Sequence, residues 1–295
     1  MIMTDYIGRY APSPTGPLHF GSLVTAVASY LDARTQSGKW LLRMEDLDKP
    51  REMPGAADEI LRTLDGYGFE WDGDVIYQSE RSELYQSYLE KLKDKQCVYP
   101  CNCSRREVAD IAHAGIEGPV YPGSCRHGLS SNRTQIAWRL RVDSDNLMFN
   151  DRVYGDIQHH LQTDFGDFVL KRADGLFAYQ LAVVVDDAEQ GINHIVRGAD
   201  LLNSTSRQIY LQQQIEATSP SYAHIPLVTN AQGEKLSKQT AAPAIAIHDA
   251  SEQLINALFF LGLDASALSS AMPIAHVWHW ALTNWQLCQV KKKII

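Results

Sequence analysis

A loop near the N-terminus combines residue types that can bind phosphate groups. It has the sequence Ala-Pro-Ser-Pro-Thr-Gly-Pro-Leu-His-Phe-Gly-Ser over residues 11–22. Gly16 and Gly21 let a ligand approach the backbone closely, and His19 stands where an amphipathic helix is expected to begin. The free N–H groups at the start of a helix favour anions. The loop therefore predicts a phosphate site, with an ordinary turn between a strand and a helix as the alternative.

A second segment, at residues 230–239, supplies positive charge. A turn of sequence Asn-Ala-Gln-Gly is followed by Glu-Lys-Leu-Ser-Lys-Gln, so Lys235 and Lys238 flank Ser237. Ammonium groups on flexible stems are suited to contact a polyphosphate. Exposed loops also carry lysines for solvation alone, so this segment points to phosphate chemistry only in combination with the first loop.

Three cysteines form the third chemical feature. Cys101, Cys103 and Cys125 offer three soft ligands within 25 positions. Zinc takes four ligands, commonly thiolate and imidazole, and the cytosol does not favour disulfides. The ordinary candidates for a fourth ligand are Cys97, His113 and His127. The cluster predicts a structural metal ion that ties down a loop with little core of its own, and buried free thiols are the alternative.

The elements that must position these groups alternate between strand and helix. Residues 6–11 and 40–44 have the composition of strands, and residues 20–36 between them have apolar positions at helical spacing. The alternation returns with a strand at 193–197, a helix at 204–216 and a strand at 224–228. This pattern predicts an α/β fold with a parallel sheet, in which ligands gather at the carboxyl ends of the strands.

A change in composition and in the alternation of strands and helices divides the chain into segments. The cysteines, a loop rich in Gly, Pro and Ser and an alternating run at 136–142 interrupt the α/β pattern. The predicted segments are the first half of a nucleotide-binding domain at 1–98, an inserted acceptor-binding subdomain with the Cys-x-Cys metal site at 99–169, the second half of the nucleotide-binding domain at 170–241 and a short helical C-terminal region at 242–295.

Composition narrows the function classes. The 295 residues are 45% hydrophobic, and no run approaches the roughly 18 apolar residues of a membrane span. We expect a soluble cytoplasmic protein without a membrane partner. Its formal charge of −8 means that a nucleic acid would need a local basic patch. Residues 126–142 provide one candidate, because they hold four arginines and no acidic residue.

Together the two loops resemble the two signatures of class I aminoacyl-tRNA synthetases. His19-Phe20-Gly21-Ser22 matches the His-x-Gly-His core except at Ser22, and Lys235-Leu236-Ser237-Lys238-Gln239 matches Lys-Met-Ser-Lys-Ser except at Leu236 and Gln239. Further matches to glutamyl- and glutaminyl-tRNA synthetases lie at 43–48, 177–180 and 196–201. The resemblance covers residues 5 to 240 and implies a Rossmann-type parallel sheet.

The resemblance implies a two-step reaction that begins with attack of the glutamate α-carboxylate on the α-phosphorus of ATP. Such chemistry depends on alignment of two anions and on charge neutralisation, with Mg²⁺ held mostly by the nucleotide. The implied catalytic residues are His19 and Lys238. The implied ATP-binding residues are Pro12, His19, Gly21, Ser22, Lys235, Ser237 and Lys238.

For glutamate, the resemblance implies a pocket made of Arg9, Ala11, Ser13, Glu45, Tyr179 and Arg197. Arg9 and Tyr179 would bind the side-chain carboxylate, Glu45 the ammonium and Arg197 the α-carboxylate. By residue type alone, Arg9 and Glu45 could instead form a cross-strand ion pair. For the metal, the resemblance implies Cys101, Cys103, Tyr121 and Cys125, although a phenol with a pKa near 10 is an unusual zinc ligand.

The C-terminal length bears on the subtype. Only 56 residues follow Gln239, and an anticodon-binding domain is expected to need on the order of 100. With the Cys-x-Cys insertion, this resembles a shortened, monomeric paralogue of glutamyl-tRNA synthetase that activates glutamate without tRNA and transfers it to the queuosine base in the anticodon of tRNA(Asp). The alternatives are an ordinary glutamyl-tRNA synthetase lacking its anticodon domain and a catalytically silent tRNA-binding paralogue.

Overall fold

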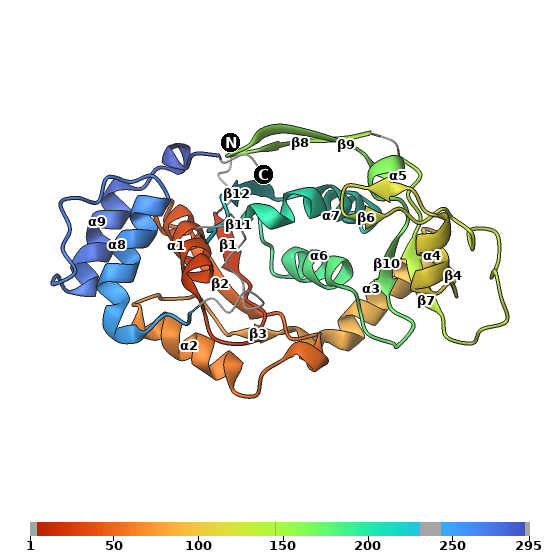
Figure 1. Cartoon of the computed structure of the whole chain (residues 1–295), viewed down its shortest axis with the longest axis horizontal. Helices are drawn as coiled ribbons and strands as arrows, with labels where there is room; N and C mark the ends of the chain where they lie inside the picture. The colour runs from red at the N-terminus through yellow and green to blue at the C-terminus, as the bar shows by residue number, and fades with distance from the viewer. Residues whose placement is uncertain (1–4, 145, 231–242, 293–295) are drawn as a thin grey trace.

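A parallel sheet forms the centre of the computed structural model, which describes residues 5–144, 146–230 and 243–292. Strands β1 (Ile7–Tyr10), β2 (Lys39–Met44) and β3 (Ile76–Tyr77) pair in parallel, as do β11 (His194–Gly198) and β12 (Ser221–Ile225). Strand β11 lies beside β1, where the Asn193 N–H donates to the Ile7 carbonyl at 3.0 Å (Figure 1). The strand order is therefore β3-β2-β1-β11-β12, which confirms the predicted Rossmann-type sheet.

The helices of this sheet follow the apolar periodicity of the sequence. They are α1 (Phe20–Arg34), α2 (Ala56–Gly66), α3 (Ser82–Asp94), α6 (Tyr179–Glu189) and α7 (Leu202–Gln214). Helix α1 connects β1 to β2, and Leu23, Val24, Val27 and Leu31 are at most 1% exposed. Because these positions recur at helical spacing, one face of α1 covers the sheet and places its N-terminus at the carboxyl end of β1.

The predicted strand at 224–228 is wrong by three residues. Strand β12 runs from Ser221 to Ile225, and its last partner in β11 is Gly198. Pro226 follows directly and has no N–H to donate to the ladder, so the pairing stops there. His224 consequently lies inside the strand and is completely buried.

The segment between α3 and α6 builds a second sheet at one end of the molecule (Figure 1). Strands β4 (Val98–Cys101), β7 (Ala137–Leu140) and β10 (Phe168–Lys171) pair antiparallel in the order β10-β7-β4. The segment also contains α4 (Arg105–Ile111), β5 (Ala114–Gly115), β6 (Gly118–Pro119), β8 (Asn146–Asp151), β9 (Gly155–His160) and α5 (Leu161–Asp164). The β8–β9 hairpin joins the edge of the main sheet, because Asp151 pairs with Tyr222 of β12.

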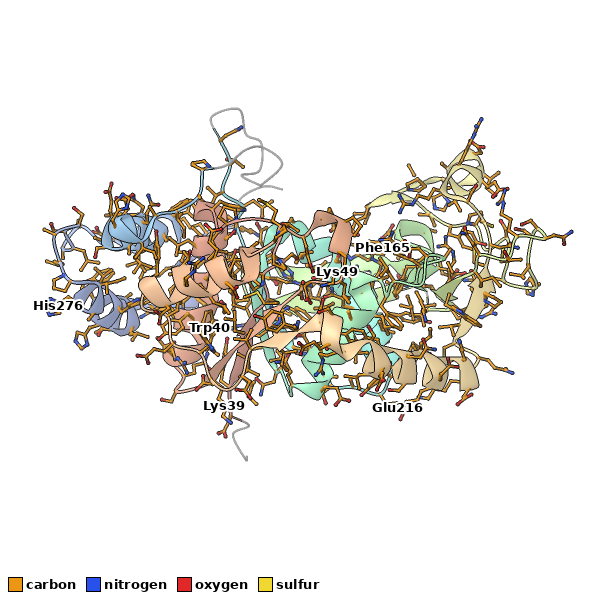
Figure 2. The ribbon with its side chains drawn as sticks, turned by 90° about the horizontal axis from the view of Figure 1, so that it is seen from below. Lys39, Trp40, Lys49, Phe165, Glu216 and His276 are labelled. Carbon is orange, nitrogen blue, oxygen red and sulfur yellow. The ribbon has the colours of Figure 1, made fainter. Side chains whose placement is uncertain are left out.

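Two C-terminal helices pack at the opposite end, as Figure 1 shows. Helices α8 (Ala250–Phe260) and α9 (Ile274–Asn284) share one apolar core with α1 and β2. The indole N–H of Trp278 donates to the Tyr67 carbonyl at 2.8 Å. Figure 2 shows Trp40 of this core in the half of the molecule that ends at His276. The C-terminal helices therefore pack on the nucleotide-binding half and share its hydrophobic core.

Short 3-10 turns complete the described elements, at Lys49–Arg51, Gln78–Arg81, Ala199–Leu201, Ile247–Asp249 and Leu287–Gln289. Within the described ranges, no helix has the length and apolar character required to cross a membrane.

Candidate active site

The loop at 11–22 carries His19 to the N-terminus of α1. His19 is the N-cap residue, and its Nδ1 accepts a hydrogen bond from the Ser22 N–H at 3.2 Å. In a neutral imidazole this acceptor role places the proton on Nε2, so Nε2–H is a donor. The first turn of α1 contains no acidic residue that would offset the positive end of the helix. This end of α1 can therefore bind an anion.

The same loop is held against the ends of neighbouring strands. The Glu45 N–H, just beyond β2, donates to the Pro12 carbonyl at 3.0 Å. Ala11 is partly buried and Ser13 is exposed on this connection. Gly21 and Ser22 occupy the first turn of α1 and are partly buried. The predicted ligand residues of β1, β2 and the loop thus lie along one edge of the sheet.

The lysine motif, with Lys235, Ser237 and Lys238, lies outside the described residues. The chain enters it after β12 and leaves it beside the first loop. There, Ala244 forms an antiparallel bridge with His19, and the Ile245 N–H donates to the Leu18 carbonyl at 3.0 Å. The described residue Ala244, five positions after Gln239, is therefore adjacent to His19.

A buried carboxylate near the end of α6 organises the arginines of the first two strands. Asp187 accepts from the Arg9 Nε at 3.1 Å and from an Arg43 terminal nitrogen at 2.8 Å. Glu45 pairs with Arg43 at 3.4 Å. In place of a direct Arg9–Glu45 ion pair, the structure has three pairs in series, from Arg9 to Asp187, from Asp187 to Arg43 and from Arg43 to Glu45. Among the described residues, both Nη groups of Arg9 lack a hydrogen-bond partner and can bind a ligand.

The neighbouring carboxylate, that of Asp186, connects Arg43 to side chains from residues 78–85. Asp186 is fully buried and accepts from Gln78 at 2.8 Å, from Arg81 at 2.7 Å and from the Tyr85 hydroxyl at 2.9 Å. Its Oδ2 also lies 3.7 Å from the Arg43 Nε. Such charges are tolerated in a core only when they are paired, so this network fixes the relative positions of β2, α3 and α6.

Arg43, Asp186 and Asp187 were not among the site residues predicted from the sequence. Each of them is a charged residue in an apolar segment, which could have identified it. Arg43 interrupts the apolar strand Trp-Leu-Leu-Arg-Met, and the two aspartates end the run Leu-Ala-Val-Val-Val-Asp-Asp. Charged residues in apolar segments require opposite charges nearby. What the sequence did not show is that these segments meet.

Glu45 and Tyr179 face this arginine cluster. Burial raises the pKa of Glu45 above its usual value, although Arg43 and Arg9 oppose the shift. Burial also raises the pKa of Tyr179, with Glu45 adding to the shift and Arg197 and Arg9 reducing it. Tyr179 therefore lies close to Arg9, Glu45 and Arg197. The Tyr179 hydroxyl has no hydrogen-bond partner among the described residues.

Arg197 brings an unsatisfied donor to the cluster. Its Nε donates to His224 at 3.0 Å and one Nη donates to the Thr205 hydroxyl at 2.8 Å. The other, Nη1, is buried without a hydrogen-bond partner among the described residues, and the residue is only 3% exposed. A buried guanidinium N–H without an acceptor is costly. An acceptor on a bound ligand would remove that cost.

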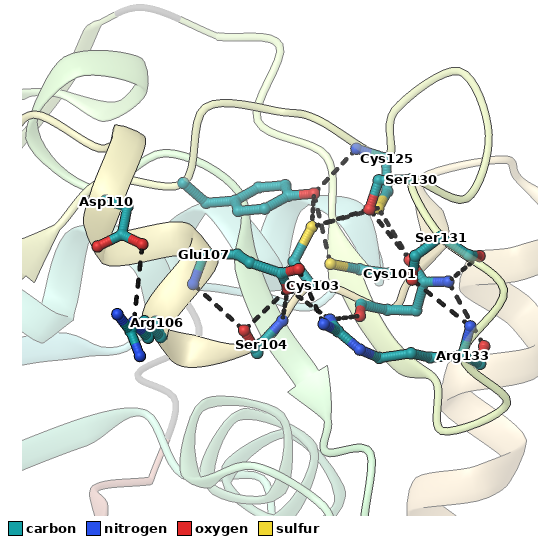
Figure 3. Close-up of polar contacts among 12 residues, drawn as sticks. Cys101, Cys103, Ser104, Arg106, Glu107, Asp110, Cys125, Ser130, Ser131 and Arg133 are labelled. Carbon is teal, nitrogen blue, oxygen red and sulfur yellow. Dashed lines mark hydrogen bonds and ion pairs between the residues drawn. The ribbon is translucent and has the colours of Figure 1, made fainter.

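The three predicted thiol ligands converge, as Figure 3 shows. The sulfurs of Cys101, Cys103 and Cys125 all lie within 4.8 Å of one another. The Tyr121 oxygen is 3.4 Å from the Cys101 sulfur and 3.5 Å from the Cys103 sulfur, and it accepts from the Cys125 N–H at 2.9 Å. Burial raises the pKa of Cys125, but hydrogen bonds with Ser130 and Tyr121 outweigh it and lower the value to about 6. The three thiols could hold a metal ion, with the Tyr121 oxygen beside them.

The other candidates for a fourth ligand have different surroundings. The Cys97 sulfur lies 3.4 Å from the Gln214 side chain. The His113 Nε2 lies 2.8 Å from the Thr163 carbonyl. The His127 side chain is exposed and does not join the group of three thiols. Of the alternatives weighed from the sequence, only the Tyr121 oxygen lies among the described thiols.

The four arginines of residues 126–142 are used within the insertion. Arg126 forms a bidentate pair with Asp167, at 2.6 and 2.5 Å. The others are Arg133, which pairs with Glu107, Arg139, which lies 3.9 Å over the Tyr121 ring, and Arg141, which lies 5.3 Å over the Tyr99 ring. Two of the four positive charges, those of Arg126 and Arg133, are therefore offset by carboxylates within the insertion.

Comparison with known proteins places this site in a family. A family model described as the catalytic domain of class I tRNA synthetases (E and Q) matches residues 7–280. The chain belongs to this family. A protein of this family is an ATP-dependent ligase.

The curated relatives are similar over nearly their full length. The chain is 58% identical to the glutamyl-Q tRNA(Asp) synthetase of Dechloromonas aromatica (strain RCB), covering 98% of this chain and 97% of that protein. It is 56% identical to the protein of the same name from Chromobacterium violaceum, covering 97% and 95%.

A solved structure shows the same fold. The glutamate tRNA ligase from Elizabethkingia meningosepticum CCUG26117, crystallised in complex with its amino acid, superposes with a TM-score of 0.79 at 23% sequence identity. The match covers 98% of this chain but only 66% of that longer chain. A glutamate-tRNA synthetase from Elizabethkingia anophelis superposes equally well, with a TM-score of 0.78.

Proposed function

We propose that this class I synthetase activates glutamate with ATP, without tRNA, and transfers it to the queuosine base in the anticodon of tRNA(Asp). The observation that carries the proposal is the charge pattern of the pocket. Arg9 and Arg197 have donors without a protein partner among the described residues, and the carboxylate of Glu45 lies near Arg9 and Arg43. Glutamate has the complementary pattern of two carboxylates and one ammonium. The names of relatives with 58% and 56% identity support the acceptor.

Each charged group of glutamate has a counterpart in this pocket. Arg9 and the Tyr179 hydroxyl bind the side-chain carboxylate, and Glu45 binds the ammonium. The free Nη1 of Arg197 binds the α-carboxylate, with Ala11 and Ser13 forming the adjoining wall at the loop. Because Asp187 holds Arg9 and Arg43 in place, the pocket is organised before the substrate arrives.

The activation step needs charge stabilisation more than covalent participation. One α-carboxylate oxygen of glutamate attacks the α-phosphorus of ATP, and the bond to the departing pyrophosphate breaks. His19 Nε2–H and the N-terminus of α1 face the phosphates, with Pro12, Gly21 and Ser22 shaping the seat. Lys235, Ser237 and Lys238 bind the phosphates from the second loop, and Mg²⁺ accompanies the nucleotide.

A fragment-mapping experiment tests the acceptor. The protein is incubated with ATP, labelled glutamate and tRNA(Asp) that carries either queuosine or guanine in the anticodon, and the product is cut with a ribonuclease. We expect label in the anticodon fragment of the queuosine tRNA and none with the guanine tRNA. Label in the 3′-terminal fragment would instead identify an ordinary glutamyl-tRNA synthetase, and absence of glutamate-dependent ATP–pyrophosphate exchange would contradict the activation step.

The pH dependence of glutamate binding tests the role of Glu45. Because burial raises the pKa of this carboxyl above its usual value of about 4.3, it loses its charge at a higher pH than an exposed glutamate. Protonation removes the partner of the substrate ammonium, so we expect the KM for glutamate to rise as the pH falls toward this raised pKa. Pyrophosphate exchange measures the effect. Glu45→Gln should have a raised KM that does not change over the same range, and an equal slope in both proteins would contradict the role.

Metal affinity tests the fourth ligand. We propose that Cys101, Cys103, Tyr121 and Cys125 hold one structural zinc ion, which fixes the ends of β4 and the following loops. Tyr121→Phe should lower the zinc affinity on the order of tenfold, measured by competition with a chromophoric chelator. Tyr88→Phe, which removes a surface hydroxyl paired with Glu189, is the matched control. Unchanged affinity in Tyr121→Phe would show that the phenol is not a ligand.

A further inference from the structure

Two buried side chains, Asp151 and His224, support the guanidinium of Arg197, and the three residues come from three different strands. Asp151, at the end of β8, accepts from the His224 Nδ1 at 2.7 Å. The other ring nitrogen of His224, Nε2, lies 3.0 Å from the Arg197 Nε. Asp151 is 1% exposed, His224 is fully buried and Arg197 is 3% exposed. The inserted segment, through β8, therefore contacts the Rossmann half directly behind Arg197.

The hydrogen bonds of Asp151 determine which tautomer His224 adopts. Asp151 also accepts from the backbone N–H groups of Val153 at 3.0 Å, Tyr154 at 2.8 Å and His224 at 3.1 Å, so its carboxylate is held ionised. A carboxylate can only accept, so the proton of His224 resides on Nδ1 and Nε2 is left as an acceptor. The Nε–H of Arg197 needs such an acceptor. The aspartate thus orients the arginine through the imidazole.

The partners of Arg197 leave its charge available. Arg9 and Arg43 both pair with the Asp187 carboxylate, so part of their charge is offset inside the protein. Arg197 is bonded to the neutral groups of His224, Thr205 and the Leu201 carbonyl. A neutral histidine can fix the orientation of a guanidinium without offsetting its charge, whereas a carboxylate in the same place would compete with a bound anion.

We propose that His224, with its tautomer set by Asp151, is a positioning residue that aims the free Nη1 of Arg197 at the α-carboxylate of the substrate. The inference rests on the proposed function, because it assigns the binding partner of Arg197 to that substrate group. It adds two residues from outside the pocket, one of them from the inserted segment, to the determinants of amino acid recognition.

The test compares two ligands that differ only at the α-carboxylate. Glutamate KM is measured by ATP–pyrophosphate exchange, and 4-aminobutyrate, which lacks that group, is measured as a competitive inhibitor. His224→Phe removes the acceptor. Asp151→Asn keeps the volume but donates to Nδ1, which turns Nε2 into a donor facing the Arg197 N–H. Each should raise the glutamate KM about tenfold and leave the 4-aminobutyrate inhibition constant and the ATP KM within twofold.

His224→Gln should recover part of the affinity, because its amide oxygen can accept from Arg197. The matched control is His159→Phe, which changes another buried histidine, bonded to Ser206 outside this chain of contacts. Equal loss for glutamate and 4-aminobutyrate would overturn the proposal in favour of a general packing role, as would an unchanged glutamate KM in Asp151→Asn. A wild-type protein without glutamate-dependent exchange would refute the proposed function itself, which is a distinguishable result.

Discussion

Lys238→Ala is expected to slow glutamate-dependent ATP–pyrophosphate exchange by about two orders of magnitude or more. This is the scale of losing one donor that stabilises charge in a transition state. The ammonium is proposed to contact the α-phosphate and the leaving group, where negative charge accumulates as the pyrophosphate bond breaks. Glutamate does not contact this loop in the proposed site, so its binding, measured by calorimetry, should remain near normal.

Lys292→Ala is the control for the loss of a positive charge, because Lys292 is exposed near the C-terminus. Its exchange rate should match that of the unmodified protein. If Lys238→Ala exchanges pyrophosphate at the unmodified rate, the second signature loop has no part in adenylate formation. A parallel loss of glutamate binding would instead place the loop in the amino acid pocket.

Asp187→Ala is expected to lower the free energy of unfolding by about 3–5 kcal/mol, the range found when one partner of a buried ion pair is removed. The variant leaves Arg9 and Arg43 in the core without their shared carboxylate. Arg9 is 4% exposed and Arg43 is fully buried, so neither can regain its lost partner from water. Urea denaturation followed by circular dichroism measures the change.

Asp174→Ala is the matched control, because Asp174 pairs with Arg172 on the surface, where both side chains are 40% exposed or more. It should cost about 1 kcal/mol or less. A comparable loss of unfolding free energy in both variants would show that the buried ion pairs of Asp187 do not stabilise the fold more than a surface pair does.

Acid should reduce the contribution of Asp187 to the free energy of unfolding. Burial raises the pKa of Asp187, but Arg9 and Arg43 outweigh burial and hold it below the usual value. A carboxyl whose pKa is depressed by folding stabilises the fold above its unfolded pKa of about 3.9, and this contribution is lost as the pH falls through the folded pKa. The difference between the unmodified protein and Asp187→Ala should therefore shrink below about pH 3.9.

The sequence by itself determined the parts of this protein that depend on local spacing. The first loop, α1 and β2 follow from glycine and proline positions and from apolar periodicity, and the structure confirms the elements within one or two residues. The two signature loops and the run at 196–201 were sufficient to indicate the family. The Cys-x-Cys pair with Cys125 predicted a convergence that the structure bears out.

Only the tertiary structure decided how distant charges are paired. Arg43 and Asp187 are 144 positions apart, and His224 and Asp151 are 73 apart, so no periodic pattern connects them. The extent of β12 was predicted three residues too late, because the strand ends where Pro226 has no N–H to donate to the partner strand. The arginines of 126–142 show the same limit, because two of the four, Arg126 and Arg133, are paired with Asp167 and Glu107 from elsewhere in the insertion. Burial makes each unpaired charge costly, and the folded chain therefore brings together partners that the linear sequence keeps apart.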